Sequence, residues 1–135
     1  MAGTFTDYLE NNLLDYVFSV ATFIPAATLY VGLSTTTITD AGGNITEPVA
    51  MGYARVAIAN NATNFPAASG GAKANATPIA FASATGDWGI LTDFFISDAV
   101  SGGNIYVHGA LTTAKAITNG DTPSIAVNGL TFTLD

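Results

Sequence analysis

The sequence has no cysteine and very few cations: of its 135 residues, Lys and Arg together number only 3. Without cysteine there is no disulfide, no thiol nucleophile and no thiolate metal site. Asp and Glu number 10, which gives a formal net charge of −7. Such a chain lacks the basic surface that direct contact with nucleic acid requires. The same shortage of cations argues against attachment to an anionic membrane surface.

Charge of either sign is scarce. Charged residues make up 10% of the chain and hydrophobic residues 49%, whereas an average soluble domain has about a quarter charged residues. Thr, Asn, Ser, Ala and Gly occupy the polar positions. Small neutral side chains lose little hydration and little conformational entropy when another protein covers them. The composition therefore favours a component of a permanent protein assembly.

Motifs for catalysis are missing as well. The sequence has no G-x-S-x-G elbow, no Walker loop, no G-x-G-x-x-G and no zinc-ligand spacing. The single histidine, His108, falls on a predicted strand opposite Ser97 or Asp98, but no acylation motif surrounds any serine. We interpret His108 as a structural or interface residue, and we expect no catalytic residue and no cofactor.

Metal sites have little support in the sequence. Asp87 and Asp98 flank a predicted strand, which would hold their carboxylates far apart because each residue advances the chain by about 3.3 Å. The segments 40–44 and 98–104 are typical of turns in which Asn and Asp side chains bond nearby backbone. A cation in one of these loops is an alternative, but neither segment has the spacing of a calcium-binding loop. We expect no metal ligand.

The N-terminal segment has helical periodicity. Apolar residues recur at spacings of three and four, which places them on one face of a helix; they are Phe5, Leu9, Leu13, Tyr16, Val17 and Val20, with Leu14 and Phe18 widening the face. Asp7 followed by Glu10 resembles a capping box, and Thr4 with Asp7 is the alternative start. We expect the helix to end between Ser19 and Phe23, before Pro25.

Beyond Pro25 the period changes to two, which is typical of strands. Predicted strands cover residues 28–33, 53–58, 78–82, 89–97, 104–111, 114–117 and 124–127, separated by long polar loops at 34–51 and 60–77. Strands 89–97 and 104–111 are expected to form an antiparallel hairpin. Asn128-Gly129 predicts a further hairpin with a type I′ turn, which would pair Val127 with Leu130 and Ile125 with Phe132.

These elements predict a mainly β protein: an antiparallel β-sandwich or flattened barrel of seven to eight strands with one N-terminal amphipathic helix. Residues 1–135 are expected to form a single domain, with the helix and a turn in 1–24 and the β-sandwich in 25–135. The length suits one hydrophobic core without metal or disulfide support.

The segment from Thr85 to Ala99 contains the only tryptophan, Trp88. In the strand at 89–97, alternation places Ile90, Phe94 and Ile96 on one face and Leu91 and Phe95 on the other. Such a strand fits the centre of a sheet that the helix or a neighbouring subunit covers on its outer face. Trp88 is then either a core residue beside a tight turn or an aromatic anchor at a subunit contact.

Interface residues are predicted from apolar or neutral character in a chain with few charges. We select the helix face with Tyr8 and Tyr16, the loop from Asn60 to Ala76, and the pair Trp88 and Phe95. Within the loop, Asn64 and Phe65 are the chosen contacts.

Nine blocks of the sequence resemble, in the same order, a family of small virion structural proteins of tailed bacteriophages, often labelled tail or tail-fibre protein. They are residues 5–10 (FTDYLE), 13–15, 27–34 (ATLYVGLS), 52–56 (GYARV), 67–72 (AASGGA), 84–89 (ATGDWG), 103–104, 108–113 (HGALTT) and 119–123 (NGDTP). The resemblance implies a location in the virion and brings no catalytic residues.

Composition and resemblance together lead to three hypotheses. The first is a non-enzymatic virion structural protein that acts as a capsid cement or decoration protein, because the chain lacks the heptads or repeats of a complete fibre. The second is a tail or tail-fibre-associated structural protein. The third is a carbohydrate-binding module at the host surface, with Tyr30, Tyr53, Tyr106 and Trp88 in a groove. Expected partners are further copies of the chain and other virion proteins, namely the major capsid protein or tail proteins.

Overall fold

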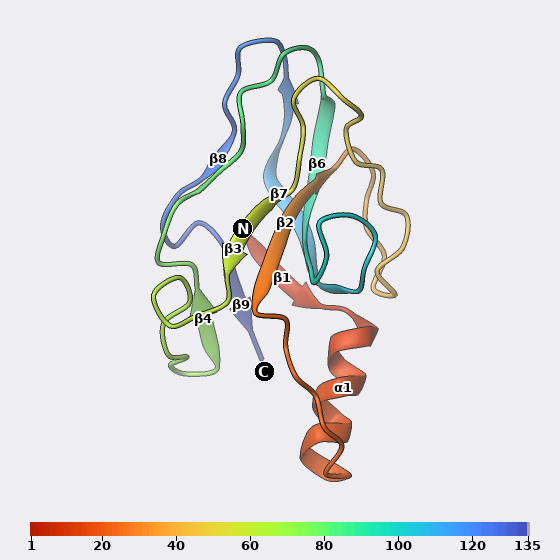
Figure 1. The fold of residues 1–135 in the computed structure, drawn as a ribbon, viewed down its shortest axis with the longest axis vertical. Coiled ribbons are helices and arrows are strands. Elements are labelled where there is room, and N and C mark those ends of the chain that lie inside the picture. Colours follow the sequence, from red (N-terminus) through yellow and green to blue (C-terminus); the bar gives the residue numbers. More distant parts are fainter. Residues whose placement is uncertain (135) are drawn as a thin grey trace.

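The computed structural model describes residues 1–134, which form one helix and nine strands. In chain order they are β1 (Ala2–Phe5), α1 (Asp7–Phe18), β2 (Thr28–Ser34), β3 (Val56–Ala59), β4 (Ala72–Ala74), β5 (Ile79–Ala80), β6 (Gly89–Ser97), β7 (Ile105–Ile117), β8 (Ser124–Ile125) and β9 (Thr131–Thr133). Seven strands form a curled sheet in the order β3-β2-β6-β7-β1-β9-β4, and β5 pairs with β8. Figure 1 shows α1 extending from one end of this sheet.

The prediction of a mainly β protein with one N-terminal helix is confirmed. The strand count is nine because two short strands, β1 and β4, join the sheet. β1 precedes the helix and pairs antiparallel with β7 and parallel with β9, Gly3 lying opposite Phe132. Strands of three or four residues carry too short an alternating pattern to stand out in a sequence. β1 fixes the base of the helix to the sheet.

The helix begins at a cap that differs from the predicted one. The hydroxyl of Thr6 accepts the backbone N–H of Leu9 and donates to the carbonyl of Ile105, so the cap also binds the helix to β7. Thr6 is fully buried. α1 ends at Phe18, where the Ser19 hydroxyl donates to the Asp15 carbonyl at 2.7 Å. No helix of the described chain has the length and apolar character to cross a membrane.

The predicted hairpin at Asn128-Gly129 does not form. Asn128 has a positive φ of 58°, but Gly129 is not among the residues with positive φ, which a type I′ turn requires at both positions. β8 pairs with β5, and β9 pairs with β1 and β4. The reason is Asn75, whose side-chain amide donates to the Ala126 carbonyl and accepts the Leu130 N–H, both at 2.9 Å. These bonds hold the turn to a distant segment.

The antiparallel pair of β6 and β7 is confirmed, and β6 has the predicted bounds. The segments predicted as two strands, 104–111 and 114–117, form one long strand, β7. Its pairing with β6 is irregular between Leu91 and Asp93. A bulge of this kind shifts which side chains face each side of the sheet.

Both faces of β6 are covered, as predicted. Phe94 and Ile96 belong to the main core, whereas Phe95 packs with Ile38 and Ile105 on the other face. The irregular pairing puts Leu91 in the main core and leaves Ile90 60% exposed, which reverses the predicted faces of these two residues. The outer cover is the loop that carries Ile38, and not the helix or a neighbouring subunit named in the prediction.

Candidate assembly surface

The residues considered for catalysis do not converge. His108 lies opposite Phe95, and its Nε2 is 3.3 Å from Oδ1 of Asp40. The Ser97 hydroxyl accepts from Arg55 at 2.7 Å and donates to the Ala99 carbonyl at 2.9 Å, so it is occupied structurally. Within residues 1–134 there is no group of three His, Asp or Glu side chains that could hold a metal ion.

Three of the predicted interface residues lie inside the chain. Trp88, Phe95 and Phe65 are 4%, 0% and 6% exposed. The indole N–H of Trp88 donates to the Met51 carbonyl at 2.8 Å. These side chains contact their own chain, so they offer no free surface to a partner.

The other three predicted interface residues are at least partly accessible. Tyr8 is half-buried and stacks on Tyr106 with the ring centroids 5.9 Å apart. Asn64 is half-buried and accepts the Thr77 hydroxyl at 2.8 Å. Tyr16 is 57% exposed. Of the six, Tyr16 is therefore the residue that presents most of its side chain to a partner.

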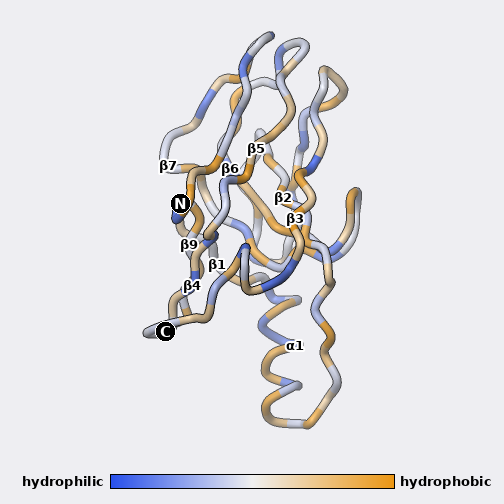
Figure 2. Tube along the Cα trace, turned by 60° about the vertical axis from the view of Figure 1, so that its left-hand side comes forward, coloured by the Kyte–Doolittle hydropathy of each residue, from blue (hydrophilic) through white to orange (hydrophobic). Residues whose placement is uncertain are grey.

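Tyr16 belongs to a larger group of exposed apolar side chains at the end of α1 and in the loop that follows. We call this group the helix tip; it consists of Leu14, Tyr16, Val17, Phe18, Val20 and Ile24, each at least 56% exposed. Figure 2 shows the helix and its return loop projecting from the sheet, with hydrophobic colour along the projecting part. Contiguous exposed apolar residues of this kind mark interaction sites.

The helix tip includes a second apolar stripe on α1. Leu9 and Leu13 face the core, whereas Leu14, Val17 and Phe18 are exposed. The last three are spaced i, i+3 and i+4, so they are neighbours on one side of the helix. The sequence prediction placed Val17 on the same face as Leu9 and Leu13 and treated Leu14 and Phe18 as a widening of that face, whereas Val17 is exposed with Leu14 and Phe18. The second half of α1 projects beyond the end of the sheet, so these side chains have no core to pack against. The sequence does not show where the sheet ends relative to the helix.

The loop after α1 adds an unusual backbone position. Val20 has a positive φ of 56° and is 91% exposed. A β-branched residue rarely adopts this conformation, and glycine or asparagine is the usual choice after a helix. The N–H of Ala21 donates to the Asp15 carbonyl at 3.2 Å across this position. The site thus keeps an apolar side chain exposed where a small residue would be less strained.

One acidic residue, Asp15, lies on α1 beside the helix tip. α1 carries Asp7 and Glu10 in its first turn, Asp15 further along, and no basic residue in its last turn. The first two favour the helix dipole, whereas Asp15 near the C-terminal end does not. A partner with cations at the edge of an apolar surface would match the helix tip in both respects.

Arg55 binds two other segments of the chain and was not identified from the sequence as a structural residue. Its guanidinium contacts both carboxylate oxygens of Glu47, at 3.0 and 2.7 Å, and donates to the carbonyls of Ala99 and Gly102. It also lies 4.7 Å from the centre of the Phe95 ring. Burial, followed by weaker effects that include the neighbouring Glu47, raises the pKa of Tyr53, whose hydroxyl donates to the same carboxylate at 2.8 Å.

A small β-rich body with a projecting apolar helix has the features of a structural protein of an assembly. A family model described as "Podophage GP4 fiber I protein gp80" matches residues 4–133. The chain belongs to this family. The predictions of a tailed-phage virion structural protein and of a location in the virion are thereby confirmed. No curated protein matches the chain.

Proposed function

We propose that this protein is a non-enzymatic structural subunit of the fibre apparatus of a tailed-phage particle, held in place through its helix tip. The observation that carries the proposal is the helix tip itself: six exposed apolar side chains on a segment that projects from a well-packed body. The body does not require them for its core, because the main core is formed by other residues.

The energetics favour a protein partner at this surface. Covering a Val, Leu, Ile or Phe side chain stabilises a complex by about 1.5–3 kcal/mol before the costs of association. Several such side chains on one projecting segment can therefore offset the loss of translational and rotational freedom. The partner we propose is another virion protein or a further copy of the chain.

The family description favours the fibre over the capsid as the location of this chain. The first hypothesis from the sequence, a capsid cement or decoration protein, has no specific contact or surface in its favour. The carbohydrate-binding hypothesis loses two of its aromatic residues, because Trp88 and Tyr106 are only 4% and 7% exposed. These observations make the second sequence hypothesis, a tail-fibre-associated protein, the one we propose.

The location can be tested by imaging intact particles with gold-labelled antibody raised against this chain. We expect label on fibres or at the tail. Label spread over the head would overturn the fibre proposal and favour the cement hypothesis. Particles that carry no label, although the antibody detects the denatured chain in them, would place the chain inside the particle and overturn both.

A further inference from the structure

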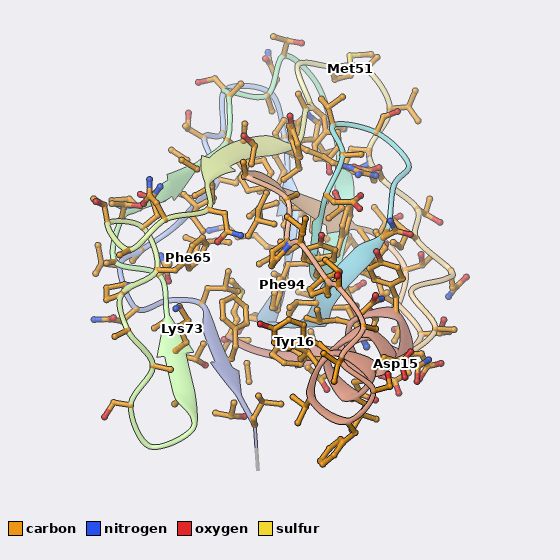
Figure 3. The ribbon with its side chains drawn as sticks, turned by 60° about the horizontal axis from the view of Figure 1, so that its bottom comes forward. Asp15, Tyr16, Met51, Phe65, Lys73 and Phe94 are labelled. Atoms are coloured by element: carbon orange, nitrogen blue, oxygen red, sulfur yellow. The ribbon has the colours of Figure 1, made fainter. Side chains whose placement is uncertain are left out.

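The described chain contains an apolar hollow at the same end of the molecule as α1. Its volume is about 240 Å³, and its lining is almost wholly apolar, including Phe5, Leu9, Phe65, Tyr106 and Phe132. Lys73 also lines it. Figure 3 shows Phe65 and Lys73 on one side of this end of the molecule and Asp15 and Tyr16 on the other.

We propose that the helix tip of a second copy of the chain inserts into this hollow. Size is the first argument. An apolar cavity of about 150 Å³ admits benzene, so a hollow of about 240 Å³ has room for an aromatic ring together with part of an aliphatic side chain. Phe18, which is 81% exposed, is the ring that the helix tip offers.

Charge is the second argument. Lys73 makes no ion pair within residues 1–134, where Arg55 pairs with Glu47. The incoming helix carries Asp15 close to Phe18 and has no basic residue in its last turn. An acidic apolar segment therefore meets an apolar hollow with a lysine at its side. Two helix tips facing each other would instead bring acids together, so the hollow is the better site for the tip of a second copy.

The helix tip of the same chain cannot fill this hollow. Leu9 lines it, and Phe18 lies nine residues further along the helix. At 1.5 Å per residue the tip is roughly 13 Å beyond Leu9 along the axis. The contact must therefore join separate copies.

The contact does not rest on the proposed function. Gold label over the head would end the fibre proposal and leave the contact between copies untouched. Conversely, a chain that binds the fibre as a monomer would end this inference alone.

Sedimentation analysis of the purified full-length chain over a range of concentrations tests the contact. We expect reversible association that weakens at least ~10-fold in Phe18→Ser, as is usual for a buried aromatic contact. Lys73→Glu and Asp15→Lys should each weaken association, and the double variant with both charges reversed should recover most of it. Lys115→Glu, at an exposed lysine on β7, is the matched control and should leave association unchanged.

Two results would overturn the inference. One is a monomer at every concentration. The other is association that survives Phe18→Ser, or that responds to Lys73→Glu no more than to Lys115→Glu, because the copies would then meet through another surface. Circular dichroism of each variant separates loss of contact from loss of fold, and recovery in the charge-reversed double variant cannot come from unfolding.

Discussion

Asn75 shows how a single buried side chain fixes the course of the chain. It is 1% exposed, and its amide nitrogen donates to the carbonyls of Thr77 and Ala126 while its oxygen accepts the Leu130 N–H. In the sequence, Asn75 is only one residue of the polar loop predicted at 60–77. Its role depends on partners up to 55 residues away, and no local pattern reports such a contact.

Replacing Asn75 by Asp should destabilise the protein by about 3 kcal/mol at neutral pH, because a carboxylate would face two carbonyl oxygens and both donated bonds would be lost. Denaturant unfolding measures the change. The cost should fall as pH is lowered, since protonation removes the buried charge. Asn61→Asp is the control: Asn61 uses only its side-chain oxygen, to accept two N–H groups, which Asp retains. Equal losses in the two variants would contradict this role.

Arg55 is the second residue whose role is defined by shape as well as charge. Its side chain is 5% exposed and contacts Glu47 through two nitrogen atoms. Lysine cannot reproduce this planar arrangement. We expect Arg55→Lys to lower the free energy of unfolding by about 2 kcal/mol, measured by urea denaturation. Lys115→Arg serves as the exposed control, and a loss in Arg55→Lys no larger than in that control would show that Arg55 acts as a point charge only.

At the scale of elements, the long elements could be predicted and two of the short strands could not. β6 and the helix carry long, strongly apolar patterns, and their positions follow from the sequence. β1 and β4 are strands of four and three residues that exist because distant strands provide their hydrogen-bond partners. The bulge that exposes Ile90 likewise depends on pairing with β7. Local pattern cannot report a register that two strands decide together.

The contact of β2 with β6 provides a test at this scale. Gly32 lies opposite Phe95, and a Cβ atom there would overlap the Phe95 ring. Gly32→Ala should therefore destabilise the protein by about 1–3 kcal/mol through overpacking, measured by thermal or denaturant unfolding. The double variant Gly32→Ala with Phe95→Leu should be more stable than the sum of the single effects predicts. Simple additivity of the two changes would show that the ring is not the obstacle.

At the scale of the whole molecule, the body and the helix tip have different tasks. The body is closed by its own core, by Arg55 and by Asn75, whereas the helix tip leaves six apolar side chains in solvent. Composition predicted an assembly component, and the predicted interface residue Tyr16 is exposed. Composition could not separate Trp88 and Phe95, which are buried, from truly accessible aromatic residues, because burial depends on how far the helix and loops reach.

The most direct test of this account is the amount of chain in purified particles when the helix tip is altered. Val17→Ser and Val100→Ser form a matched pair, since the two valines are 62% and 65% exposed and only Val17 lies in the helix tip. Both variants should keep the free energy of unfolding within about 0.5 kcal/mol of the original. We predict that quantitative immunoblotting of particles finds Val100→Ser at the normal level and Val17→Ser reduced severalfold. Normal incorporation of a folded Val17→Ser protein would contradict the central claim that the helix tip attaches this chain to its assembly.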